Sequence, residues 1–149
     1  MADLIAVLRA SAVSISTSAL TLLQITAAAQ QRVKLKEVGI TFAGTVNTNA
    51  PVLVQLMVQT TAGTPGSTPT PVKTDGDMQE TVQTTGAIGF SAEPTYGAVL
   101  REWYVHPQSG VIVPLPLGRP PVLKGGTRCG LVVTAANAVT GSAYVEFEE

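Results

Sequence analysis

The chain alternates between short runs of valine, isoleucine, leucine and threonine and turns marked by glycine or proline. It contains 14 glycines and 10 prolines in 149 residues, and its helical signals are weak. Short extended runs separated by turn residues at close intervals are typical of antiparallel sandwiches and barrels. The sequence therefore predicts an all-β protein: a β-sandwich or jelly-roll-like antiparallel domain of about eight strands.

The expected strands differ in how their apolar residues alternate. The parity slips between Leu35 and Val38, which predicts a β-bulge or a strand that changes sheets. Residues 51–59 are apolar on both faces and predict a central or covered strand. The last run alternates clearly, and we expect Glu148 and Glu149 to end it in water. The runs expected as strands are AVSIST, ALTLLQIT, RVKLKEVGITFAG, PVLVQLMVQT, ETVQTT, VLREWYV, VIVPLPL, RCGLVVTAA and SAYVEFE.

The length fits one domain, which we place at residues 11–149. Residues 1–10, MADLIAVLRA, cluster four apolar side chains near the terminus. They predict a first strand, one helical turn or an N-terminal arm that docks on a neighbour, and we favour the strand or the arm. Removal of these ten residues is then expected to weaken assembly more than the fold. The apolar candidates for a partner interface here are Leu4, Ile5, Val7 and Leu8.

Residues 60–78, TTAGTPGSTPTPVKTDGDM, fall outside the strand pattern and predict a long exposed loop. Loops of this length without regular structure are usually functional or mobile. Pro65, Pro69 and Pro71 are therefore further candidates for contact with a partner, although contact with solvent stays open as the alternative.

Charged residues make up 13% of the chain, against about 25% in ordinary soluble domains. Either threonine, serine and glutamine coat the surface, or other subunits cover much of it; we favour the second and expect a homo-oligomer. The net charge is −1 and no basic run occurs, so nucleic acid is not an expected partner. No apolar run reaches the length of a membrane span, and the N-terminus makes a poor signal peptide, so we expect folding in the cytoplasm.

The residue types that carry most chemistry are too sparse for a site. His106 and Cys129 are each the only one of their kind, whereas a zinc site needs three or four such ligands at set spacings. Asp75 and Asp77 flank a glycine and read as a turn. HPQSG and LKGGTRCG also read as turns between strands. We therefore expect no catalytic residues, no cofactor and no metal, and a protein that is not an enzyme.

The stretch EPTYGAVLREWYVHPQSGVIVPLPLG holds the only tryptophan, Trp103, which we expect to pack on a sheet face. Pro114 and Pro116 are two residues apart, so their missing N–H groups point the same way. The strand that carries them should therefore be an edge on that side. This stretch reads as structural rather than catalytic.

Residues 51–64, 93–135 and 143–149 carry a resemblance to a known family. PVLVQLMVQTTAGT, EPTYGAVLREWYVHPQSGVIV, PLGRPPVLKGGTRCG and AYVEFEE resemble small proteins encoded in the structural gene clusters of tailed bacteriophages and prophages. The resemblance covers about residues 33–149 and implies no catalytic residue.

This resemblance implies a virion component. The leading expectation is a capsid decoration (cement) protein: a small β-rich subunit, often a homotrimer, that binds the major capsid protein on the outside of the head and stabilises the shell. The expected location is thus the capsid surface, after assembly in the host cytoplasm. The alternatives are a head-tail joining, collar or tail-surface protein, and a module that binds a host ligand.

Overall fold

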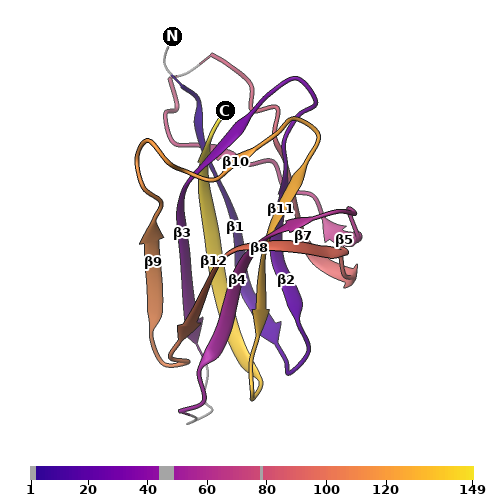
Figure 1. Cartoon of the computed structure of the whole chain (residues 1–149), viewed down its shortest axis with the longest axis vertical. Coiled ribbons are helices and arrows are strands. Elements are labelled where there is room, and N and C mark those ends of the chain that lie inside the picture. Colours follow the sequence, from indigo (N-terminus) through magenta and orange to yellow (C-terminus); the bar gives the residue numbers. More distant parts are fainter. Residues whose placement is uncertain (1–2, 44–48, 78) are drawn as a thin grey trace.

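The computed structural model describes residues 3–43, 49–77 and 79–149, and these form two antiparallel sheets packed face to face (Figure 1). Sheet A has the order β10-β3-β12-β1-β6, with β9 also paired to β3, and sheet B has the order β5-β7-β2-β11-β4-β8. The all-β antiparallel sandwich is confirmed. The strands are β1 (Ile5–Ile15), β2 (Leu20–Thr26), β3 (Val33–Ala43), β4 (Val52–Gln59), β5 (Thr64–Ser67), β6 (Val72–Lys73), β7 (Thr85–Ala92), β8 (Tyr96–Val105), β9 (Gly110–Pro114), β10 (Val122–Leu123), β11 (Arg128–Thr134) and β12 (Val139–Glu148).

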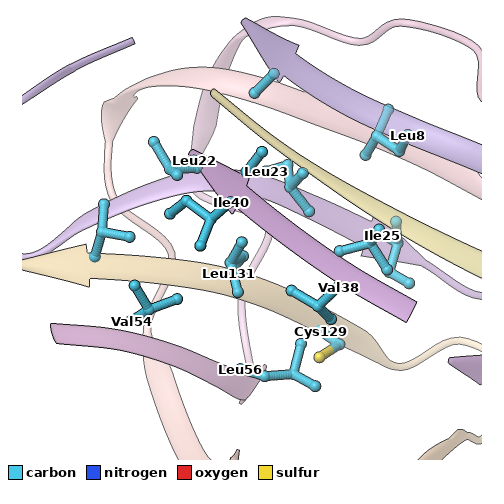
Figure 2. Close-up of a cluster of buried hydrophobic side chains, with 14 of the residues drawn as sticks. Leu8, Leu22, Leu23, Ile25, Val38, Ile40, Val54, Leu56, Cys129 and Leu131 are labelled. Atoms are coloured by element: carbon cyan, nitrogen blue, oxygen red, sulfur yellow. The ribbon is translucent and has the colours of Figure 1, made fainter. Parts of the chain in front are cut away.

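The core lies between the two sheets, where alternate residues of β1, β3 and β12 meet those of β2, β4 and β11. Phe147 and Leu35, directly opposite each other on β12 and β3, are fully buried. Each large apolar side chain buried in this way contributes about 1.5–3 kcal/mol relative to exposure. Figure 2 shows part of this core: Leu8, Leu22, Leu23, Ile25, Val38, Ile40, Val54, Leu56, Cys129 and Leu131.

A β-bulge explains the slip of parity in β3. Glu37 pairs with Glu146 and Leu35 pairs with Phe147, which leaves Lys36 as the extra residue. Val33 and Leu35 before the bulge, and Val38 and Ile40 after it, can therefore all face the core. The bulge predicted between Leu35 and Val38 is confirmed.

The N-terminal residues form a strand inside sheet A. β1 lies between β12 and β6, and Leu4 and Leu8 are buried. Of the alternatives for residues 1–10, the first strand is the one observed, so neither a helical turn nor an arm describes residues 5–10. Met1, Ala2, Gly44 and Met78, which fall within expected segments, lie outside the described residues.

The expected loop over residues 60–78 contains two short strands. β5 pairs with β7 at the edge of sheet B, and β6 pairs with β1 at the edge of sheet A. The segment thus runs from one sheet to the other along one side of the sandwich. The strand expected at ETVQTT is wrong, because residues 80–84 are irregular and the strand begins at Thr85.

The C-terminal glutamates are not in water as expected. Glu148 is only 5% exposed, and its carboxylate forms ion pairs with Lys34 and Lys36 on β3. The half-buried Glu149 accepts a hydrogen bond from the backbone N–H of Gln83 at 2.6 Å. Both side chains reach cationic or N–H donors on neighbouring segments, and these contacts replace water.

One continuous segment supplies the outer strands of both sheets on one side. β8 is the last strand of sheet B, beyond β4, and β9 and β10 lie beyond β3 in sheet A. Residues 106–109 join β8 to β9 directly. We call residues 96–122 the β8–β10 margin. In Figure 1, β9 lies on the left of the molecule and β5 on the right.

Candidate functional site

Most of the exposed large apolar side chains belong to the β8–β10 margin, where Ile112 lies on the outer face of sheet A and Tyr104 on the outer face of sheet B. Over the described ranges, seven large hydrophobic side chains are exposed, and six of them belong to residues 96–122. Leu117 is 88% exposed and Tyr104 is 71% exposed. The six are Tyr96, Val99, Tyr104, Ile112, Leu117 and Val122, and the seventh is Val72.

The local sequence explains why this margin stays uncovered. β8 pairs with β4 and β9 pairs with β3, and neither strand has a further neighbour in its sheet. Pro114 ends β9 and Pro116 follows it, so this edge offers few N–H donors, and the predicted edge strand is confirmed. β8 contains no proline, but its pairing with β4 shifts register twice, and such bulges twist an edge away from simple strand addition. The margin therefore favours contact through side chains.

Few charges interrupt the margin. Glu102 accepts a hydrogen bond from the Gln55 amide at 3.1 Å, and the Arg101 guanidinium donates to the Leu100 carbonyl at 2.7 Å. Trp103 is half-buried and packs against the core, as expected from the sequence. Glu102 and Arg101 thus have partners within the fold and Arg119 is exposed, so large apolar side chains outnumber charges on the margin.

The four apolar N-terminal candidates for an interface fall into two pairs, because alternate residues of this segment face opposite sides of the sheet. Leu4 and Leu8 point into the core and are buried. Ile5 and Val7 lie on the outer face of sheet A and are half-buried. Two of the four are therefore unavailable to a partner while the domain is folded.

The three proline candidates lie together. Pro65 and Pro69 are half-buried and Pro71 is buried, and all three line one hollow of about 500 Å3. Five threonines also line this hollow, together with Gln24 and Arg128. The structure thus brings residues of the 60–78 segment beside a strand residue, Arg128, that the sequence did not single out.

His106 and Cys129, the residue types most often associated with catalysis, lie in a turn and in the core respectively. His106 is exposed in the turn between β8 and β9, where its Nδ1 accepts a hydrogen bond from the Gln108 N–H at 3.2 Å. Cys129 is buried, and burial raises the pKa of its thiol to about 12. A thiol with so high a pKa is a poor nucleophile at neutral pH.

Among residues 3–43, 49–77 and 79–149, no three His, Cys, Asp or Glu side chains gather closely enough to hold a metal ion. The Asp75 carboxylate accepts a hydrogen bond from the Asp77 N–H at 3.0 Å, as in a turn. No helix in the described part of the chain is long and apolar enough to cross a membrane.

Part of the β8–β10 margin could be predicted from the sequence. The spacing of Pro114 and Pro116 located an edge strand, but alternation could not show that Tyr104 and Ile112 would be left uncovered. That outcome depends on β8 and β9 coming last in their sheets. Arg128 gave no signal, because a lone arginine at the start of an apolar strand is ordinary.

Comparison of the chain with protein-family models, with curated proteins and with solved structures gave no match.

Proposed function

We propose that this protein is a virion structural subunit: a capsid decoration (cement) protein that forms a homo-oligomer, with a trimer favoured, and binds the major capsid protein on the outside of a bacteriophage head. The observation that carries the proposal is the concentration of exposed apolar side chains on the β8–β10 margin. The sequence resemblance over residues 93–135 supports it, since this range contains the whole margin.

Low charge and exposed apolar side chains together favour a surface that other subunits cover. A chain with 13% charged residues has little charge with which to keep an exposed apolar margin soluble as a monomer. Burial of one leucine, isoleucine or valine side chain contributes about 1.5–3 kcal/mol. Several such contacts, repeated over a symmetric shell, act together through avidity even where each is weak. The chain thus contributes binding surface rather than a reacting group.

The first test measures self-association. We expect light scattering of the purified chain to give a multiple of 15.4 kDa, and three copies for the favoured trimer. Ile112→Ser and Leu117→Ser should each weaken association about tenfold or more, because each removes one apolar contact. Val72→Ser is the matched control, since Val72 is exposed to a similar extent but lies outside the margin.

The second test locates the chain in particles. Electron microscopy of purified phage particles should place hundreds of copies on the head. Tens of copies or fewer at a joint or on the tail would instead assign the chain to the head-tail, collar or tail-surface class. A monomer whose Ile112→Ser variant binds heads as well as the parent chain would refute the proposal.

A further inference from the structure

We infer that the hollow around Arg128 binds a small hydroxylated carboxylate, a sugar acid being the chemical class that fits. The hollow lies over β2, β7 and the start of β11, closed by residues 62–71. It shares no residue with the β8–β10 margin, so the inference is independent of the proposed function.

The strand register places Arg128 on the β11 side of the hollow. On β11 it pairs with Thr26 of β2 on one side and with Gln59 of β4 on the other. Thr26 and Gln24, both on β2, also line the hollow. The guanidinium therefore stands on a rigid sheet rather than on a loop, which limits the ordering required on binding.

Arg128 lacks an anionic partner. Its Nε is buried and has no hydrogen-bond acceptor in the structure. Within the described ranges, no carboxylate lies within 4.0 Å of its guanidinium, and it is the one charged side chain that lines the hollow. A buried donor without an acceptor costs about 1–3 kcal/mol, so the fold leaves the hydrogen bonding of Arg128 incomplete. Because Nε is shielded from solvent, an acceptor that enters the hollow can pair only with the remaining guanidinium N–H groups.

Two carboxylates bonded to β2 or to a lining residue of the hollow are engaged elsewhere. The Glu149 carboxylate accepts from the Gln83 N–H and from the Thr84 N–H at 2.9 Å. The Glu93 carboxylate accepts from the Thr21 N–H at 2.8 Å and from the Tyr96 hydroxyl at 3.1 Å. These hydrogen bonds hold both carboxylates in place, so neither is free to turn toward Arg128.

The charge and lining of the hollow define the ligand. One guanidinium with no second cation matches a monoanion, and its planar fork matches a carboxylate in bidentate geometry. A phosphate dianion would need further positive charge. The Thr84 hydroxyl already donates to Glu149, and the other four threonines offer hydroxyl groups that can donate to and accept from ligand hydroxyls. The volume of about 500 Å3 falls within the range of small-molecule sites.

The test is a ligand titration at low salt, monitored through the NMR chemical shifts of the whole chain. Sodium glucuronate is the main probe; glucose lacks the carboxylate, acetate lacks the hydroxyls, and inorganic phosphate is the dianion. We expect saturable shifts at Arg128 and Thr26 with glucuronate, weaker binding of acetate and phosphate, and none of glucose. Tighter binding of phosphate than of glucuronate, or equal binding of glucose and glucuronate, would overturn the inference.

Two variants and a control separate recognition from general charge. Arg128→Lys keeps the charge but removes the fork, and Arg128→Gln removes both, so each should weaken glucuronate binding about tenfold or more. Arg119→Gln, in the exposed turn before β10, should bind like the parent chain. Thermal melts confirm that each variant is folded. A folded Arg128→Gln variant that binds glucuronate unchanged would refute the site.

Discussion

Tyr144 on β12 lies directly opposite Gly39 on β3, and its ring covers the position that a Cβ at residue 39 would occupy. The Tyr144 hydroxyl donates a hydrogen bond to the Glu37 carboxylate. This bond and burial raise the pKa of Tyr144 to about 12. An aromatic ring laid over a glycine on the neighbouring strand is a known means of fixing sheet register.

Substitution at Gly39 should therefore destabilise the fold. Gly39→Ala is expected to lower the free energy of unfolding by about 1–3 kcal/mol, because the new methyl group overlaps the ring. Urea denaturation measures the change. Gly76→Ala is the control, since nothing lies within 4 Å of a Cβ there. The loss should shrink in a Tyr144→Ala background; an equal loss in both backgrounds would contradict the overlap.

A buried hydrogen-bond network joins β4 to β2 across β11 in sheet B. Gln59 on β4 reaches over Gly130 of β11 to Gln24 and Thr21 of β2, where it accepts from the Gln24 amide at 2.8 Å and donates to the Thr21 hydroxyl at 3.0 Å. Gln59→Ala should destabilise the protein by about 1–3 kcal/mol, because it leaves buried polar groups without partners. Thermal denaturation checks this, with Gln55→Ala, on the same strand, expected within about 0.5 kcal/mol of the parent.

The strand β1 contains a left-handed residue. Ala12 has a φ of 52° in the bulge where pairing with β12 jumps from Ala10 to Val13. Ala12→Gly should stabilise the fold by up to about 1 kcal/mol, because glycine adopts this conformation without the steric cost of Cβ. Ala98→Gly in β8, where φ is ordinary, should instead destabilise by about 0.5–1 kcal/mol. Equal effects of the two substitutions in denaturant melts would contradict the assigned strain.

Removal of residues 1–10 should abolish folding, in contrast to the expectation from sequence. β1 contributes Leu8 and Ala10 to the core and fills the place between β12 and β6. Leu8→Ala, a milder change, is expected to cost about 2–5 kcal/mol, while Arg9→Ala on the outer face should change little. Circular dichroism of the truncated chain measures the first effect and chemical denaturation the second. A truncated chain with native circular dichroism would contradict this role of β1.

Acid should weaken the contact between β12 and β3. Hydrogen bonds from Lys34 and Lys36 lower the pKa of Glu148 from 4.5 to about 2. A carboxyl whose pKa is lower in the folded state stabilises the protein above the unfolded pKa, and this stability is lost as the pH falls from about 4.5 to about 2. Glu148→Gln should cost about 1 kcal/mol at pH 7 and flatten the stability profile over that range. If the Glu148→Gln variant lost stability between pH 5 and pH 2 as steeply as the parent chain, Glu148 would not be the group responsible.

Several features could be predicted because they are local. The alternation of apolar residues indicated an all-β fold, and the slip around Lys36 located a bulge, since parity is a property of one strand. Pro114 and Pro116 marked an edge, because a missing N–H excludes a ladder partner whatever the rest of the fold. The strand at Thr85–Ala92 was missed, since its three small residues and its glycines give little apolar signal.

The order of strands came only from the tertiary structure. Alternation determines which face of a strand is apolar, but any strand with a matching face satisfies it. The chain by itself therefore determined that two apolar layers would form and where some edges must fall. Packing decided that β1 lies inside sheet A, that residues 96–122 close one side with their apolar groups outward, and that Arg128 meets the 62–71 segment, because these depend on contacts between residues far apart in sequence.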